Sequence, residues 1–237
     1  MADYKKITRD IVDHLSLHYD PVGVSLYDTQ TVPSGMEFSE KELKSYCQAL
    51  TLAGRGETLL LRKEQMGCKL GTSVLGFEKG KEMDAYLDDG VLEKYGVGLF
   101  ESEEASADTI LNSFYLEAGK TVAALIAPVT EFQTEPQAVV FTANSEQVMW
   151  LLYALNYEKG GKMDLPQSGG ALGGCADITA LPLLKGEANI TFLGLGCRMK
   201  SQIGPGDLMM GMAGSDLNMV HKNILHMSKP ISMLSKA

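Results

Sequence analysis

Long apolar segments and a surplus of positive charge are both absent from this chain of 237 residues. Its longest apolar runs, such as residues 122–129, reach about half of the ~20 residues that a membrane-spanning helix requires. Lysine and arginine number 21 against 30 aspartate and glutamate residues, a net charge of -9. Because binding to nucleic acid or to an anionic membrane begins when basic side chains neutralise phosphates, we expect neither as a partner.

The N-terminal residues also lack the apolar core of a secretory signal. They read MADYKKITRD, alternate acidic and basic side chains, and lead into an amphipathic segment. We therefore expect a cytoplasmic protein. The cytosol keeps thiols reduced, so the four cysteines of such a chain are expected to be thiols or metal ligands rather than disulfides.

Helical and strand patterns alternate along the chain, which predicts an α/β fold with a mixed sheet in one domain over residues 1–237. Helices are expected at residues 4–15, 39–54, 146–157, 175–184 and 215–227, and strands at 22–26, 58–64, 121–129, 137–144, 189–197 and 207–213. Ser39 with Glu42 reads as the capping box of the second helix, and Asn144 as the N-cap of the third. Surface helices and loops are expected in the more highly charged residues 80–119.

The four cysteines form two matched pairs. Cys47 and Cys68 are 21 positions apart, and Cys175 and Cys197 are 22 apart. Each interval reads as a helix, a glycine turn, a strand and a glycine directly before the second cysteine. This pattern predicts an internal repeat, residues 21–80 and 137–212, whose two related halves pack about a pseudo-twofold axis.

Four cysteines that converge at the junction of two such halves would supply the usual ligands of a [4Fe-4S] cluster or a tetrahedral zinc ion. An iron–sulfur cluster is favoured over zinc because the chain lacks the short C-x-x-C knuckles of many zinc sites. Two other readings remain open. Cysteine is often a buried, metal-free core residue, and two of the thiols could form a redox pair.

A glycine-rich stretch, SGGALGGC at residues 168–175, opens onto the helix that is expected near Cys175. Backbone N–H groups of Gly173 and Gly174 could bind the anionic part of a cofactor or ligand there, or the glycines could let two backbone segments pack closely. Arg198 directly follows Cys197. It could bind a carboxylate or phosphate through two hydrogen bonds, or form a surface salt bridge.

Several short motifs together resemble one protein family, the domain of unknown function 169 of anaerobic bacteria and archaea. The residues that carry this resemblance are Pro21–Val24, Tyr46–Leu50, Ala53–Gly56, Glu64, Cys68, Leu75–Gly76, Ala127–Pro128, Pro136–Ala154, Cys175 and Gly196–Arg198. They span nearly the whole chain. The resemblance implies a cysteine-containing cytosolic protein of anaerobes, which favours an oxygen-sensitive cofactor.

The leading hypothesis is a redox protein in which Cys47, Cys68, Cys175 and Cys197 bind an iron–sulfur cluster or another metal. Gly173, Gly174 and Arg198 would lie near a small anionic ligand. Its expected partners are a small-molecule ligand or a redox protein, and a homo-oligomer is compatible with the sequence. The alternative is a metal-free module with structural cysteines that binds a small molecule or a protein between its two halves.

Overall fold

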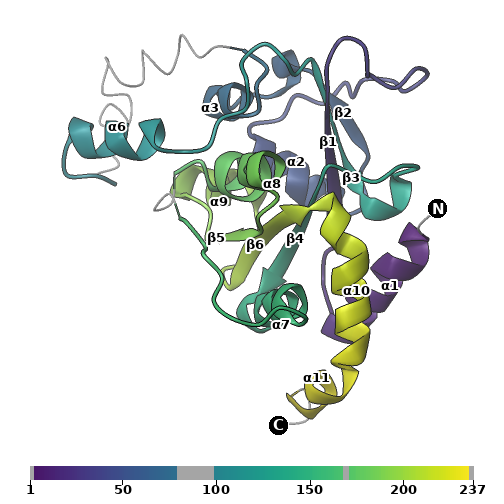
Figure 1. Ribbon diagram of the computed structural model, residues 1–237. Helices are drawn as coiled ribbons and strands as arrows, with labels where there is room; N and C mark the ends of the chain where they lie inside the picture. Colours follow the sequence, from purple (N-terminus) through teal and green to yellow (C-terminus); the bar gives the residue numbers. More distant parts are fainter. Residues whose placement is uncertain (1–2, 79–98, 168–170, 235–237) are drawn as a thin grey trace.

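A single six-stranded sheet lies at the centre of the computed structural model, which describes residues 3–78, 99–167 and 171–234 (Figure 1). The strands are β1 (Val22–Tyr27), β2 (Leu59–Leu61), β3 (Ala123–Pro128), β4 (Ala138–Asn144), β5 (Asn189–Thr191) and β6 (Asp207–Ala213). Their order across the sheet is β2-β3-β1-β4-β6-β5, and every pair of neighbours in this sheet is antiparallel. The predicted α/β class is confirmed, whereas the predicted mixed sheet is wrong. Alternating helices and strands indicate layers but do not fix the direction of each strand.

Helices connect these strands and cover both faces of the sheet. The α-helices are α1 (Tyr4–Leu15), α2 (Tyr46–Ala53), α3 (Lys69–Val74), α6 (Glu103–Leu111), α7 (Ser145–Asn156), α8 (Leu181–Lys185), α9 (Leu195–Ser201), α10 (Leu217–His226) and α11 (Ser228–Leu234). A π-helix, η3 (Gly173–Ala180), precedes α8, and three short 3-10 turns are η1 (Lys63–Gln65), η2 (Val129–Glu131) and η4 (Gly214–Asp216). Within the described ranges, no helix is both long and apolar enough to cross a membrane. Most of the surface helices expected at residues 80–119 lie outside the described residues.

Capping side chains determine where two of these helices begin. The Asn144 side chain accepts the Gln147 N–H, and the Gln147 side chain accepts the Asn144 N–H, so the predicted N-cap of α7 is confirmed. Helix α2 begins at Tyr46 with Ser45 as its N-cap, and the predicted start at Ser39 is wrong. The segment before it stays out of the helix because the Ser39 and Leu43 N–H groups donate to carbonyls of the β2 strand and the η1 turn.

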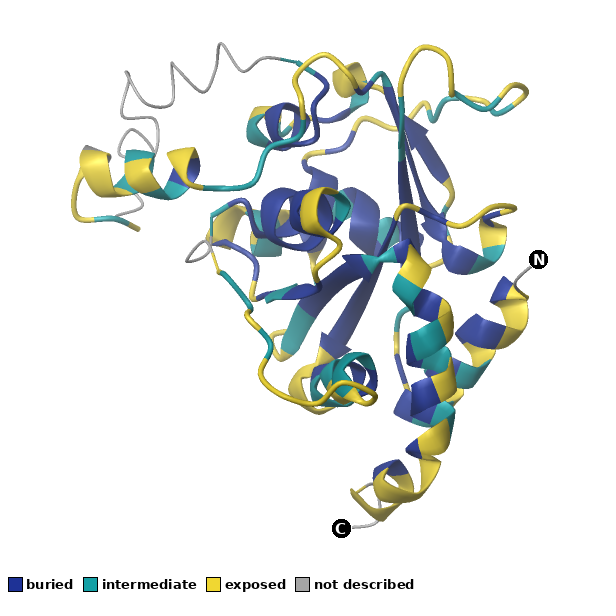
Figure 2. Cartoon of the chain, viewed as in Figure 1, coloured by how far each residue is buried: buried dark blue, intermediate teal, exposed yellow. Residues whose placement is uncertain are grey.

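Alternate residues of each strand point to opposite faces of the sheet, as the pleat requires. We call one side the thiol face: it carries Val24, Ile126 and Val140, and it is covered by α2, α3, η3, α8 and α9. The other, the opposite face, carries Leu125, Val139 and Phe141 and is covered by α1, α7, α10 and α11. Figure 2 shows the strands buried between the two layers, with exposed residues on the outer sides of the helices.

Two consecutive parts of the chain each supply three neighbouring strands. Strands β1, β2 and β3 form one half of the sheet, and β4, β5 and β6 form the other. In each half the first strand lies at the centre, the third lies beside it and the second lies at the edge. The halves meet where β1 pairs with β4, in the register Val22 to Val140 and Val24 to Ala138.

A glycine in β6 lets the π-helix pack directly on the sheet. A Cβ atom at Gly211 would stand 1.9 Å from the Ile178 carbonyl oxygen, a backbone atom of η3. No larger residue fits at that position without moving the helix. The close approach holds η3, and the cysteine near its start, against the thiol face.

Candidate functional site: four converging cysteines

Each of the four cysteines lies at the beginning of a helix on the thiol face. Cys47 is the second residue of α2, Cys68 is the N-cap of α3, and Cys175 and Cys197 are the third residues of η3 and α9. Cys47 and Cys175 are buried, and the other two are partly exposed. All four are free thiols.

The strand predicted from Asn189 is confirmed, but its predicted end at Cys197 is wrong. β5 stops at Thr191, whose hydroxyl oxygen accepts the Leu193 N–H, and Leu193 has a positive φ of 60°. This turn leads into α9, whose N-cap is Gly194. Cys197 therefore lies in the first turn of α9. The other three cysteines likewise lie at or near the first turn of their helices.

The structure brings the four thiols together, although they lie up to 150 positions apart in the sequence. Cys47 interacts electrostatically with each of the other three, Cys175 also with Cys68 and Cys197, and Cys68 also with Cys197. Every pair among the four is thus within electrostatic reach.

Cys47 and Cys197 share a side-chain hydrogen bond within the cluster. The Cys47 thiol donates, which lowers the pKa of Cys197 and, together with burial, raises the pKa of Cys47. The positive charge of Lys200 also lowers the pKa of Cys197. Cys197 is therefore the member of the cluster that ionises most readily.

Burial dominates at the two remaining thiols. It raises the pKa of Cys175 well above the ordinary value and also raises that of Cys68. At Cys68, backbone N–H groups of Gly71 and Leu70 and the charge of Lys200 act in the opposite direction. Thiolates at these positions would need a compensating positive charge, such as that of a metal centre.

The four thiols do not form a ready-made site for one metal ion. In the described part of the chain, no three His, Cys, Asp or Glu side chains form a group that could hold a metal ion. The four cysteines thus share one region of the thiol face without a preformed single-ion site.

Gly173 and Gly174 lie at the beginning of η3, where backbone approaches side chains very closely. A Cβ at Gly174 would stand 2.5 Å from the Cys47 sulfur, and one at Gly173 would stand 2.2 Å from the Thr191 hydroxyl. The glycines therefore allow η3 to reach α2 and β5. Residues 168–170 of the predicted glycine loop lie outside the described residues.

The π-helix itself is buried along all eight residues. Thr179 donates its hydroxyl to the Gly174 carbonyl at 2.9 Å, and the Tyr46 hydroxyl lies 3.0 Å from the same Thr179 oxygen. Burial raises the pKa of Tyr46 strongly, so its hydroxyl stays protonated. Segments of π-helix are rare and are frequent at functional sites.

Arg198 faces backbone rather than an acidic side chain. Its guanidinium donates to the carbonyl oxygens of Phe192 at 2.7 Å, Asp207 at 2.7 Å and Gly204 at 3.3 Å. These bonds tie α9 to the segment before β6 and so fix the helix that carries Cys197.

Sequence reasoning missed several polar neighbours of the cysteines. Tyr115 lies within electrostatic reach of Cys175, and its hydroxyl donates to the Ile110 carbonyl. Tyr46 could have been found from its place next to Cys47. Thr179 lies one helical turn after Cys175 in η3, and Lys200 lies three residues after Cys197 in α9. Nothing in the sequence marks Tyr115, because it reaches the cluster from a segment that carries no cysteine.

The fold and the site together define the class of protein. It is an α/β protein with an antiparallel sheet, helices on both faces of that sheet, and a cluster of four thiols on one face. Residues 10–223 match the model of the family described as Uncharacterised ArCR, domain of unknown function 169. The chain therefore belongs to that family, as its motifs suggested. No curated protein matches the chain, and no solved structure matches it.

Proposed function

We propose that Cys47, Cys68, Cys175 and Cys197 bind a [4Fe-4S] cluster and that the protein is a redox protein. Such a cluster, when bound, supplies one-electron transfer at a potential set by its charge, its hydrogen bonds and its exposure to solvent. The observation that carries the proposal is that all four cysteines of the chain lie within electrostatic reach of one another.

The number and type of the ligands support a four-iron cluster. Four cysteine thiolates are the usual ligands of a [4Fe-4S] cluster, and the four cysteines lie within electrostatic reach of one another. The chain also lacks the short C-x-x-C knuckles of many zinc sites, which favours an iron–sulfur cluster over a zinc ion.

In this proposal, the burial, charge and exposure of the cysteines and of Lys200 each affect how the cluster is bound and reached. The cysteines bind as thiolates, so assembly releases the protons that burial holds on Cys47 and Cys175. Lys200 places a positive charge near Cys68 and Cys197 and offsets part of the negative charge of the thiolates. Cys68 and Cys197 are the partly exposed members, so a redox partner protein would approach from their side.

The proposal includes an internal repeat with a pseudo-twofold axis between β1 and β4. The palindromic strand order supports it, because β1, β2 and β3 would correspond to β4, β5 and β6. Cys47 and Cys175 each lie in the helical segment before the edge strand, and Cys68 and Cys197 at the helix after it. Because the cysteines occupy equivalent positions in the two halves, the proposed pseudo-twofold axis would bring the two cysteine pairs together.

Anaerobic reconstitution with iron and sulfide tests the proposal. The unaltered chain should develop the broad absorbance of an iron–sulfur cluster, and Cys47→Ser, Cys68→Ser, Cys175→Ser and Cys197→Ser should each lose most of it. Ala49→Ser is the matched control, because it adds the same hydroxyl to helix α2 at a buried position and removes no sulfur. Its spectrum should match that of the unaltered chain.

Two results would contradict the proposal. One is cluster assembly that survives all four single cysteine substitutions. The other is a metal-free chain in which Cys47 and Cys197 lose two protons and two electrons to a disulfide oxidant and form a stable bond, which would indicate thiol chemistry instead.

A further inference from the structure

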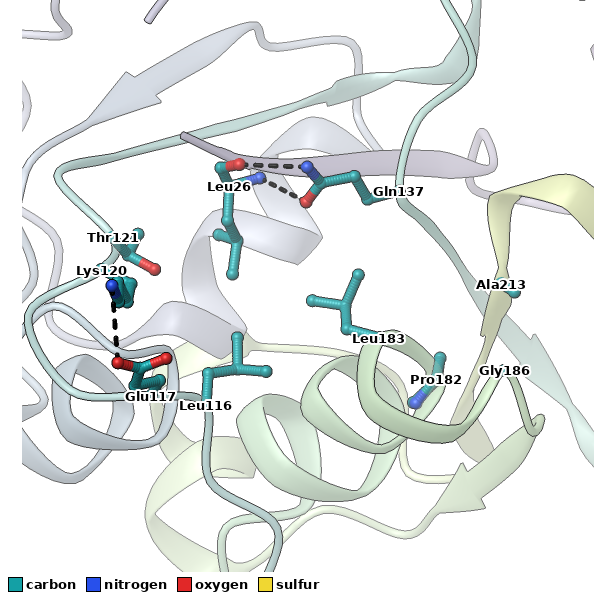
Figure 3. Close-up of a pocket in the computed structure, with 10 residues that line it drawn as sticks. All are labelled: Leu26, Leu116, Glu117, Lys120, Thr121, Gln137, Pro182, Leu183, Gly186 and Ala213. Carbon is teal, nitrogen blue, oxygen red and sulfur yellow. Dashed lines mark hydrogen bonds and ion pairs between the residues drawn. The ribbon is translucent and has the colours of Figure 1, made fainter. Parts of the chain in front are cut away.

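A separate pocket opens at the edge of the thiol face. It has a volume of about 550 Å³ and lies between the end of β1, the loop before β3 and helix α8. Its lining residues are Leu26, Leu116, Glu117, Lys120, Thr121, Gln137, Pro182, Leu183, Gly186 and Ala213 (Figure 3). The volume lies within the range of small-molecule sites in proteins, about 300–1,000 Å³.

Apolar side chains from three elements form the walls. Leu26 of β1, Leu116 of the loop and Leu183 of α8 point into the same space (Figure 3). All three are partly buried and pack against the hydrophobic cluster that contains Cys47 and Cys175. The pocket therefore offers an apolar molecule a surface that is continuous with the protein core.

Hydrogen bonds hold this surface in place without a ligand. The Gln137 side-chain amide accepts the Leu26 N–H at 2.9 Å and donates to the Leu26 carbonyl at 3.1 Å, so it replaces a neighbouring strand (Figure 3). The Thr121 hydroxyl donates to the Leu75 carbonyl at 2.6 Å. A wall that is already ordered loses little conformational freedom when a ligand binds.

One cation lies at the rim. Lys120 pairs with Glu117 at 3.5 Å, and their side chains are 68% and 75% exposed. An ion pair as exposed as this contributes little stability, about 0–1 kcal/mol. An anionic group of a ligand can therefore compete with Glu117, and with the nearby Asp28 carboxylate, for Lys120.

We propose that this pocket binds a small amphipathic anion, with its hydrocarbon body against the three leucines and its carboxylate at Lys120. The inference goes beyond the iron–sulfur proposal and does not depend on it, since no cysteine lines the pocket.

A second pocket gives an internal comparison. It has a volume of about 380 Å³, lies beside α7 and is lined mainly by apolar residues such as Val148, Leu152 and Met163. None of its described lining residues is charged. A ligand chosen for its apolar body alone would have no reason to prefer the first pocket over this one.

Titration with octanoate, octanol and octylamine, followed by methyl NMR and calorimetry, tests the proposal. Octanoate should bind most tightly, shift the methyl signals of Leu26, Leu116 and Leu183, and leave those of Leu152 and Met163 unchanged. Lys120→Gln should weaken octanoate binding roughly fivefold, the upper range for one exposed charge, and leave octanol binding unchanged. Lys229→Gln on the exposed surface of α11 is the matched control and should have no effect.

Three outcomes would overturn the inference. These are octanoate shifts confined to the pocket beside α7, equal affinity for all three probes, and octanoate binding that Lys120→Gln leaves unchanged. Because the probes can be titrated into protein with or without iron, a failure of the iron–sulfur proposal would not alter these readouts.

Discussion

The two faces of the sheet are built from different kinds of helix. The opposite face is covered mainly by longer α-helices: α1 and α7 have 12 residues each and α10 has 10, whereas α11 has seven. The thiol face is covered by α2, α3, α8 and α9, which have five to eight residues, and by a π-helix. The four cysteines all pack on the thiol face or at its edge.

Both interiors contain buried polar groups, and those of the thiol face lie beside the cysteines. On the opposite face, Asn223 donates to the Ala154 carbonyl and Gln147 to the Leu15 carbonyl, so these side chains join helices to one another. On the thiol face, a hydrogen-bonded pair, Tyr46 and Thr179, is buried next to the cysteines. If the cysteines bind the proposed cluster, the opposite face contributes mainly stability and the thiol face holds the site.

The largest expected effect tests the stabilising role of the opposite face. Phe141 is fully buried there, and Phe141→Ala should lower the free energy of unfolding by about 4 kcal/mol, measured by urea denaturation. Iron incorporation per folded chain should stay unchanged. Met233→Ala, at a 65% exposed side chain on α11, is the control and should change stability by less than about 0.5 kcal/mol. Loss of iron in the folded Phe141 variant would contradict the separate roles that we assign to the two faces.

An intermediate effect is expected at the contact between η3 and α2. Gly174→Ala would place a methyl group 2.5 Å from the Cys47 sulfur, so the two segments must separate. We expect a loss of about 2 kcal/mol in the free energy of unfolding and a marked fall in iron incorporation.

Gly196→Ala provides the matched control for this substitution. Gly196 lies next to Cys197 in α9, and nothing stands within 4 Å of a Cβ at that position. Replacement of a helical glycine by alanine there should raise stability by up to about 1 kcal/mol and leave iron incorporation unchanged. Equal behaviour of the two alanine variants would show that the close contact at Cys47 has no role in the site.

The smallest expected effect is a change in the pH dependence of stability, and it involves the opposite face. Hydrogen bonds from Lys6, in the same helix, and from His221 lower the pKa of Asp10 to about 2, and the bond to His221 joins α1 to α10. Because the folded pKa lies below the unfolded value of about 3.9, this contribution is present above pH 4 and is lost as the pH falls through 2. Asp10→Asn should therefore flatten the acid limb of a stability–pH curve, whereas Asp13→Asn, at an exposed position of the same helix, should not. An unchanged acid limb in the Asp10 variant would contradict this assignment.

Local sequence signals predicted most of the elements but not their arrangement. Alternating apolar residues located β1, short apolar runs located β3, β4 and β6, and Asn144 identified the start of α7, because these signals depend on neighbouring residues. The direction of the strands depends on long-range pairing, which a single sequence does not record. The apparent capping box at Ser39 failed for the same reason, since its segment bonds to the β2 strand and the η1 turn.

The candidate site shows a similar limit. The matched spacing of the cysteines predicted that they converge, and the structure places them within electrostatic reach of one another. The sequence did not reveal that Arg198 would be bound by three carbonyls, that η3 would be a π-helix, or that Tyr115 would reach Cys175. Each of these depends on packing between segments that are distant in the chain.

The iron and acid-labile sulfide content of the chain, purified without oxygen and without reconstitution, tests the central claim most directly. The account predicts roughly four iron atoms and four sulfides per chain, the content of one four-iron cluster. A chain that contains neither iron nor sulfide and has four titratable thiols would contradict it.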